Sequence, residues 1–256
     1  MLTKMKYNED GVFITKDKKF KPLHNFKEKT LETTLKFAYD MTFGKNGEHR
    51  NHRTGGTHLR KNGEIFANTF QGKLSEFAVY NTLYKDFPNL NTPDTETYGL
   101  GEWDNADFEV NNKKISVKST KSFGNLLLLE TKDWNNKGEY IPNINKGCAF
   151  YDYFILVRVN PHCEDLLKKN KILYSQNLDY NVLINILLNE KKWEYDIPGF
   201  ITREQLIYAI NNNFVINKGD MLNGKTKMDA QNYYIQSGDM EDISQLKRFF
   251  NFRYID

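Results

Sequence analysis

The stretch WDNADFEVNNKKISVKST, residues 103–120, decides the fold that we predict from this sequence. Apolar and polar residues alternate on either side of the pair Asn111-Asn112, which is the pattern of a β-hairpin with a two-residue turn. The first expected strand carries a carboxylate, Asp107, and the second carries an ammonium group, Lys118. Because side chains alternate between the two faces of a strand, pairing across this turn can bring Asp107 and Lys118 to one side of the sheet.

Two explanations fit this pair of charges. A cross-strand ion pair on an exposed sheet face is common and contributes little to stability. The other explanation is a metal-dependent active site, and it depends on Glu76. This glutamate lies in an expected helix that is apolar nearly all round, where an ionised carboxylate is rare unless it is paired or bound to metal. A capping or solvent-facing role is the ordinary alternative for Glu76.

A glutamate on a helix, an aspartate on a strand and a Val-Lys pair on the next strand together resemble the PD-(D/E)XK nuclease superfamily. The matching residues are Gly72–Glu76, Asp107 and Ile115–Thr120. The resemblance covers residues 70–130, about a quarter of the chain, and extends less strongly through 149–159. The general pattern is most similar to type II restriction endonucleases, in which variable flanking segments recognise the DNA sequence.

The resemblance implies an enzyme that hydrolyses phosphodiester bonds of double-stranded DNA with Mg²⁺. It implies that Asp107, Glu76 and the carbonyl of Val117 bind the metal, a hard cation that prefers oxygen ligands. It also implies that Lys118 orients and helps to deprotonate the attacking water and stabilises charge on the phosphate. A compact ammonium suits this role because its pKa adapts more readily than that of a guanidinium.

One position departs from the family pattern. Ser116 stands where the family has Asp or Glu, and a hydroxyl is a poor substitute for a carboxylate as a metal ligand. Glu76 is the favoured source of the missing charge, with Asp104 and Glu109 as alternatives. The dipeptide Pro93-Asp94 matches the family name but lies in the loop before the strand, so it receives little weight. A catalytically inactive DNA-binding protein, or a structure-specific or RNA-processing nuclease, remains the alternative function.

A second group of candidate residues suits contact with DNA. Residues 1–70 contain fourteen Lys/Arg and eight Asp/Glu, and residues 44–64 form a glycine-rich basic stretch that we expect to be a loop. Arginines in such a loop can hold phosphates or bind guanine edges, although a solvated loop is the ordinary alternative. A zinc site from its histidines is disfavoured because no cysteine is near. The expected DNA contacts are Arg50, Arg53, His58, Arg60 and Lys61, together with Ser119, Thr120 and Lys121 after the second strand of the hairpin.

The expected fold class is α/β, with a mixed central β-sheet flanked by helices and with additional helical and β segments. Hydrophobic periodicity predicts helices at 26–43, 72–84, 164–169 and 182–188, and another helix that begins after the N-cap Thr202. Further strands are expected at 125–130 and 149–159, a hairpin at 6–21, a turn at Pro198-Gly199, and short strands after residue 214.

Composition limits the class of protein further. The 256 residues are 39% hydrophobic and 27% charged, as in ordinary globular proteins, and the longest apolar runs are too short to span a membrane. Without a signal sequence and with only two cysteines, the expected location is the cytoplasm. We expect an N-terminal basic region at 1–69, a nuclease core at 70–165 and a recognition or dimerisation part at 166–256, or all three as one domain. Cleavage of both DNA strands favours a homodimer.

Overall fold

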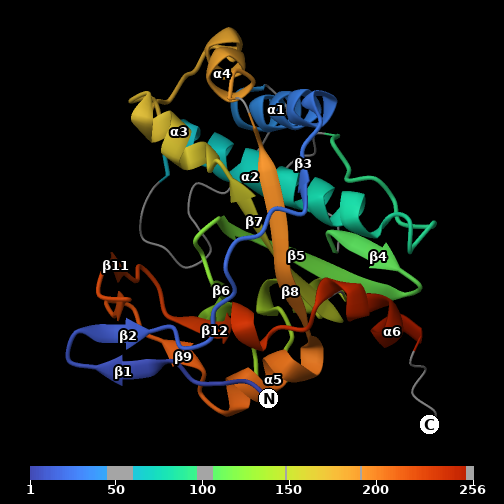
Figure 1. Ribbon diagram of the computed structural model, residues 1–256, viewed down its shortest axis with the longest axis vertical. Helices are drawn as coiled ribbons and strands as arrows, with labels where there is room; N and C mark the ends of the chain where they lie inside the picture. Colours follow the sequence, from blue (N-terminus) through green and yellow to red (C-terminus); the bar gives the residue numbers. More distant parts are fainter. Residues whose placement is uncertain (45–59, 97–105, 148, 191, 252–256) are drawn as a thin grey trace.

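The computed structural model describes residues 1–44, 60–96, 106–147, 149–190 and 192–251 (Figure 1). The fold is α/β with a mixed central sheet flanked by helices, as predicted. Five strands form the central sheet in the order β3 (His24–Asn25), β8 (Glu194–Thr202), β7 (Tyr153–Asn160), β5 (Lys113–Lys121) and β4 (Phe108–Val110). In this sheet β5 and β7 are parallel, and the other neighbours are antiparallel.

Two smaller sheets complete the β-structure of the described residues. One contains β6 (Leu126–Glu130), β12 (Asn232–Gln236) and β9 (Val215–Ile216). The other contains β1 (Lys6–Asn8), β2 (Gly11–Phe13), β10 (Met221–Leu222) and β11 (Thr226–Lys227). The predicted hairpin near the N-terminus, the strand at 125–130 and the short strands after residue 214 are therefore confirmed.

The hairpin that decided the predicted fold is formed by β4 and β5. Phe108 pairs with Ile115, and Val110 pairs with Lys113. Asn111 and Asn112 have φ angles of 51° and 61°. A two-residue turn of this kind requires positive φ at both central positions, and asparagine tolerates the left-handed region better than most residues. The sequence pattern and the local backbone therefore agree.

The central sheet separates two hydrophobic cores, as the alternation of side chains along β7 shows. Ile155 and Val157 belong to the core shared with the helices α1 (Glu28–Phe43), α2 (Asn62–Leu83), α3 (Cys163–Lys169) and α4 (Tyr180–Leu187). Phe154 and Leu156 belong to the core shared with the β6–β12–β9 sheet and α5 (Arg203–Asn211). The short helix α6 (Leu246–Asn251) ends the described chain (Figure 1), and its residues Phe249 and Phe250 pack against Phe200 of β8 and Tyr153 of β7.

The helix α2 begins ten residues earlier than predicted. We expected a loop up to residue 64 and a helix at 72–84, whereas α2 covers Asn62–Leu83. The first turns of α2 are held by buried Ile65, Phe66 and Phe70, and the amide of Lys61 donates to Glu64 Oε2 at 2.9 Å. Polar residues and Gly63 masked this periodicity in the sequence, and burial of the aromatic residues overrides their weak helix propensity.

The predicted turn at Pro198-Gly199 is wrong, because both residues lie inside β8. The pairing of β7 with β8 shifts register between Leu156 and Arg158, and proline is tolerated at such irregularities because it removes no regular ladder bond. A side chain on Gly199 would overlap the carbonyl oxygen of Glu241, so glycine permits close approach of that segment. The predicted N-cap that follows is confirmed, since Thr202 Oγ1 accepts from the amide of Gln205 and Gln205 Oε1 accepts from the amide of Thr202.

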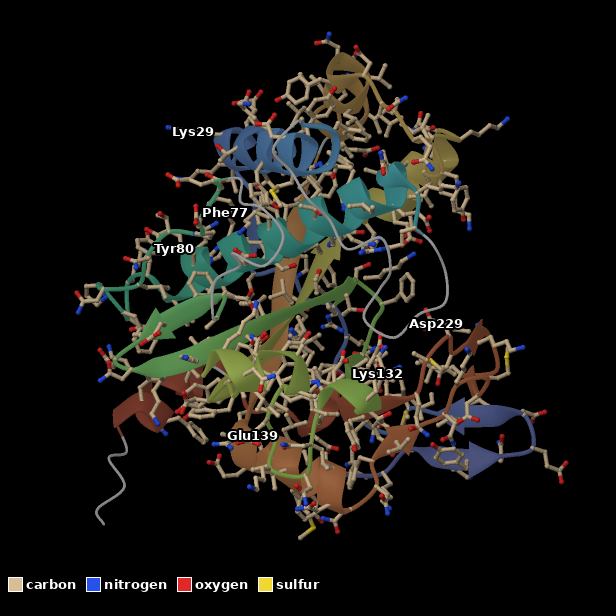
Figure 2. All side chains as sticks on the ribbon, turned by 180° about the vertical axis from the view of Figure 1, so that it is seen from behind. Lys29, Phe77, Tyr80, Lys132, Glu139 and Asp229 are labelled. Carbon is tan, nitrogen blue, oxygen red and sulfur yellow. The ribbon has the colours of Figure 1, made fainter. Side chains whose placement is uncertain are left out.

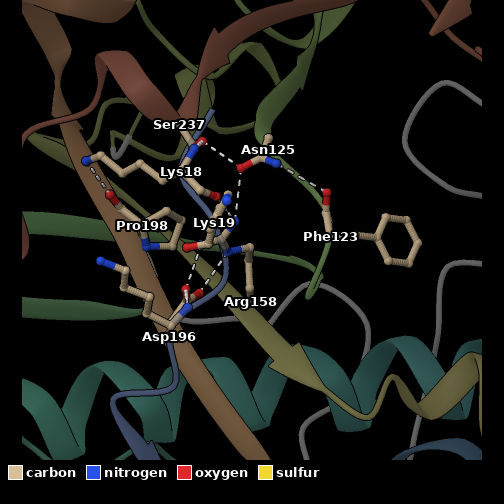
Figure 3. Close-up of polar contacts among 9 residues, drawn as sticks. Lys18, Lys19, Phe123, Asn125, Arg158, Asp196, Pro198 and Ser237 are labelled. Carbon is tan, nitrogen blue, oxygen red and sulfur yellow. Dashed lines mark hydrogen bonds and ion pairs between the residues drawn. The ribbon is translucent and has the colours of Figure 1, made fainter. Parts of the chain in front are cut away.

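Arg158 on β7 fastens the N-terminal segment to the central sheet (Figure 3). Its Nε and Nη2 atoms donate to the two carboxylate oxygens of Asp196 at 2.8 and 2.6 Å. Its remaining bonds reach the carbonyl oxygens of Lys18 and Lys19 and the side-chain oxygen of Asn125. The side chains of Arg158 and Asp196 are only 1% and 6% exposed. This buried ion pair is therefore bidentate and fully hydrogen-bonded, which is the geometry in which burial of two charges is tolerated.

The expected domain boundaries do not coincide with gaps between elements. The boundary after residue 69 falls inside α2, and β2 pairs with β10 across most of the chain length. Likewise β6 pairs with β12 of the C-terminal part. None of the helices in the described part of the chain has the length and apolar character needed to cross a lipid bilayer.

Candidate functional site

Asp107 occupies a defined position at the edge of β5. Its Oδ2 atom accepts the amide N–H of Val117 at 2.6 Å and lies 3.4 Å from Ser116 Oγ. Ladder pairing between β4 and β5 ends at Phe108 and Ile115, so the amide of Val117 is the next donor on that edge. Because the N–H and C=O of one residue point to the same edge of a strand, the Val117 carbonyl faces Asp107 as well. The carboxylate is thus held beside the backbone oxygen that the family resemblance assigns to the metal.

Glu76 lies on α2 and is mostly buried, with its side chain 16% exposed. Its Oε2 atom is 2.6 Å from the ammonium of Lys73, one helical turn earlier, and that ammonium also lies over the ring of Phe37. The carboxylate that appeared anomalous in an apolar helix therefore has a cationic neighbour. The pairing lowers the cost of burying Glu76, which the sequence pattern alone did not explain.

A cavity of about 260 Å³, which we call the acidic cavity, brings Glu76 and Asp107 together. Asp94 and Glu96 also line it, so four carboxylates and the ammonium of Lys73 meet at one space. Among the described residues, its lining is Phe37, Met41, Asn68, Thr69, Gly72, Lys73, Glu76, Asp94, Glu96, Ala106 and Asp107. Several carboxylates gathered at one cavity are more typical of a ligand site than of a stabilising arrangement, because like charges at short range repel one another.

Asn68, Thr69 and Glu96 were not singled out from the sequence, Lys73 was taken only as part of the matching segment Gly72–Glu76, and Asp94 received little weight. Asn68, Thr69 and Lys73 lie at helical spacing with Glu76 and form a polar stripe on a helix that is otherwise largely apolar. That stripe was the available signal, because polar residues repeating at three or four positions mark one helix face. Glu96 follows two residues after Asp94, and the amide of Glu96 donates to Asp94 Oδ1 at 2.8 Å.

Lys118 lies on the face of β5 opposite to α2. Ser119 hydrogen-bonds Ser75 of α2 at 2.8 Å, so the residues next to Ser119 along the strand face away from this helix. Lys118 lines a different cavity of about 260 Å³, the aromatic cavity, which is bounded by Leu128, Leu129, Glu130, Asp133, Trp134, Tyr140 and Tyr151. In Figure 2, α2 with Phe77 and Tyr80 lies on one side of the β4–β5 hairpin, and the segment with Lys132 lies on the other.

The ammonium of Lys118 differs from those of its neighbours on β5. Lys113 is paired with Asp152 at 3.0 Å, and Lys121 is paired with Asp165 at 2.6 Å. Within the part of the chain that the structure describes, the Lys118 ammonium has no hydrogen-bond or ion-pair partner. The carboxylates of Glu130 and Asp133 line the same cavity, so an anionic ligand would share this ammonium with them.

Ser116, which the family resemblance places at the position of the acidic residue, supplies no negative charge there. It is 2% exposed, and its hydroxyl lies beside the Asp107 carboxylate. Among the alternative sources of charge, Glu109 is exposed on β4 and shares a second, open cavity with Asp94 and Asp107. Asp104 lies outside the described residues.

The expected DNA contacts have different positions. Arg50, Arg53 and His58 lie outside the described residues, as do the two histidines considered for zinc, His49 and His52. Arg60 and Lys61 immediately precede α2, at its N-terminal end. Ser119 is hydrogen-bonded to Ser75, Lys121 is paired with Asp165 and Glu164, and Thr120 lies between them on β5.

The donor atoms around Asp107 suit a hard divalent cation in their chemistry. Asp107 and Glu76 offer carboxylate oxygens and Val117 offers a carbonyl oxygen, the donor types that Mg²⁺ prefers. Among the described residues, no group of three or more His, Cys, Asp or Glu side chains is close enough to hold a metal ion by itself. Mg²⁺ commonly uses only one or two protein carboxylates and completes its shell with water and substrate phosphate, so this donor set is compatible with it.

Thiol chemistry has no support in the described residues. Cys163 is buried at the start of α3, and burial raises the pKa of its thiol well above the ordinary value. A buried thiol of this kind is rarely ionised and is inert as a nucleophile.

Comparison of the chain with protein-family models, with curated proteins and with solved structures found no match.

Proposed function

We propose that this protein is a Mg²⁺-dependent endonuclease that hydrolyses phosphodiester bonds of double-stranded DNA, in the manner of a sequence-specific type II restriction enzyme. The observation that carries the proposal is the position of Asp107. Its carboxylate is hydrogen-bonded to the Val117 amide, next to Lys118, and lines the same cavity as Glu76 on α2. The helix acid and the strand acid, which are 31 positions apart in the sequence, are thereby brought to one site.

In this proposal Asp107, Glu76 and the Val117 carbonyl hold the metal. When bound, the metal polarises the phosphate and lowers the pKa of a water molecule. The Val117 amide fixes the orientation of the Asp107 carboxylate, and Lys73 limits the repulsion between Glu76 and the other acids of the acidic cavity. Lys118 emerges from the opposite face of β5 and neutralises charge that develops on the phosphate at the strand edge. Within the described residues Lys118 makes no ion pair, unlike Lys113 and Lys121 on the same strand, and this supports the role.

The substrate class rests on charge as well as on the resemblance. The strand β5 carries four lysines and no acidic residue. Lys113 and Lys121 are paired with Asp152 and Asp165, so Lys114 and Lys118 supply the positive charge that attracts a phosphate-bearing polymer. Cleavage of both strands is simplest with one site for each strand, although one site can also cut the strands in turn, so we propose that two copies of the chain act together.

The second candidate is a catalytically inactive DNA-binding protein on the same scaffold. Two observations favour it. Ser116 supplies no negative charge beside Asp107, and Lys118 lines the aromatic cavity instead of the acidic cavity. The same experiment separates the two candidates.

The purified chain is incubated with supercoiled plasmid in Mg²⁺ or in EDTA, and the products are separated on agarose. We expect linear or discrete fragments in Mg²⁺ and intact plasmid in EDTA. Asp107→Asn should lower the cleavage rate at least about 100-fold, because a direct ligand matters at least as much as the groups that orient ligands. Lys118→Ala should lower it by about 10²- to 10³-fold while DNA binding persists.

The matched controls are Asp40→Asn on α1 and Lys113→Ala on the same strand as Lys118. Both residues make surface ion pairs away from the acidic cavity, and both variants should cut at the wild-type rate. Retarded but intact plasmid with wild-type protein in Mg²⁺ would favour the inactive binder. Full cleavage by Asp107→Asn would show that the catalytic site lies elsewhere.

A further inference from the structure

Phe123 stands out in the turn that joins β5 to β6. Its side chain is 75% exposed, more than any other large apolar residue in the described chain except the terminal Met1. Single exposed apolar residues are ordinary on protein surfaces. Phe123 differs from them because hydrogen bonds fix the backbone turn that carries it.

The turn is fixed on both sides of Phe123. The amide of Gly124 donates to the Lys121 carbonyl at 2.7 Å, and a side chain on Gly124 would overlap Thr120. Asn125 Oδ1 accepts from Ser237 Oγ at 2.7 Å and from Arg158 Nη1 at 2.9 Å, so the turn is tied to the buried Arg158–Asp196 pair. Figure 3 shows the Phe123 ring pointing away from this network. A ring on a rigid support loses little conformational entropy when it binds.

The charges around this turn indicate the class of partner. Upstream, β5 ends at Lys121 beside the turn, whereas Lys113 and Lys114 lie at the opposite end of this strand. The segment 16–21, whose carbonyls at Lys18 and Lys19 accept from Arg158, contains four lysines and one aspartate, and Lys16, Lys19 and Lys21 are exposed. Asp165 and Glu164 neutralise Lys121, so the net positive charge near the turn comes from the lysines of the segment 16–21. Basic residues interleaved with an aromatic ring suit a nucleic-acid strand, in which phosphates and bases alternate.

We propose that Phe123 stacks on a base of the bound DNA, with the lysines of 16–21 attracting the adjacent phosphates. This inference rests on the proposed function, because it takes DNA as the partner. Bases inside a regular duplex already stack on each other, so the ring engages a base at an opened or kinked step. We therefore expect this turn to bind DNA at a distorted step more tightly than a uniform duplex.

The test measures binding in EDTA, so that hydrolysis does not interfere. Fluorescence anisotropy is recorded with two labelled DNAs, a perfect duplex and the same duplex with three unpaired bases. Phe123→Ala should weaken binding to the interrupted duplex by about 5- to 150-fold, which corresponds to the loss of one stacked base, about 1–3 kcal/mol. Phe123→Trp should retain the affinity, and its added indole fluorescence should be quenched when that DNA binds.

Tyr174 provides the matched control, since it is also a strongly exposed aromatic residue, 60% exposed, but lies between α3 and α4. Tyr174→Ala should bind as wild type, and the indole of Tyr174→Trp should not be quenched. Equal binding by Phe123→Ala and wild type overturns the stacking inference while leaving the nuclease proposal intact. If the wild type binds the interrupted duplex through Phe123 but does not cleave plasmid in Mg²⁺, the nuclease proposal alone is overturned. A wild-type protein that binds neither DNA overturns both.

Discussion

Two charged regions of this protein are organised in opposite ways. At Arg158 and Asp196, one cation and one anion are buried together, and the guanidinium donates to every acceptor around it. In the acidic cavity, four carboxylates and the ammonium of Lys73 are gathered among the described residues, and Asp107 is exposed. The first arrangement stabilises the folded chain by matching charges, whereas the second gathers several carboxylates at an accessible site. Carboxylates gathered in this way suit a ligand that supplies positive charge.

The largest effect that tests this contrast is expected from Arg158→Met. The substitution leaves Asp196 buried without its partner and releases the carbonyls of Lys18 and Lys19. Breaking a buried pair in this way costs about 3–5 kcal/mol, and urea unfolding measures it. The control Lys36→Ala removes an exposed pair with Asp40 and should cost less than about 1 kcal/mol. If both variants lose the same small amount, burial does not distinguish the two kinds of charge.

An intermediate effect is expected from Glu76→Gln in the acidic cavity. The carboxamide cannot supply the negative charge that the proposed metal needs, so cleavage should fall at least about 100-fold, as for Asp107→Asn. The free energy of unfolding should change by less than about 1 kcal/mol, because removing one of four like charges offsets the weakened pairing with Lys73. Plasmid cleavage and urea unfolding are measured on the same preparation.

The control for Glu76→Gln is Glu32→Gln, which changes an exposed glutamate of the neighbouring helix α1. It should leave both cleavage and stability at the wild-type values. A loss of several kcal/mol by Glu76→Gln with full cleavage would mean that Glu76 serves the fold through Lys73, as the buried pair does through Arg158.

The smallest effect concerns Asp242, an exposed carboxylate that caps a short 3₁₀ turn. It accepts hydrogen bonds from the amide and hydroxyl of Ser244, and these bonds lower the pKa of Asp242 below its ordinary value of 3.8. A lowered folded-state pKa contributes stability above pH 3.8 that is lost as the pH falls further. Asp242→Asn should therefore be less stable than wild type by a few tenths of a kcal/mol at pH 6, and the difference should shrink at pH 3. Urea midpoints at the two pH values measure this, and a difference independent of pH would contradict the assignment.

The sequence predicted those parts of the fold that depend only on interactions within a short segment. The Asn111-Asn112 turn follows from the tolerance of asparagine for positive φ, and the Thr202–Gln205 capping box closes over four residues. The start of α2 and the path of Pro198 through β8 were predicted wrongly. Both depend on partners far away in the chain, which local propensity does not contain.

The candidate site shows the same division between local and distant information. Residue type and spacing indicated Glu76, Asp107 and Lys118 as site residues. In the structure Glu76 and Asp107 line one cavity, whereas Lys118 lines another. The sequence showed that side chains alternate along β5, but it did not show which face of this strand α2 would cover. Asp94 and Glu96 join the site from a loop, so no periodicity could have placed them there.

The sequence by itself determined the hairpin, the first helix, the capped helix after Thr202 and the α/β class, because these follow from the period of apolar residues and from backbone preferences acting over a few positions. Only the tertiary structure decided that Arg158 would meet Asp196, that four carboxylates would surround one cavity and that Lys118 would face away from α2. These outcomes depend on the pairing of β5 with β7 and of β7 with β8 across long stretches of chain. Such pairings are selected by packing of the whole core, which no short segment encodes.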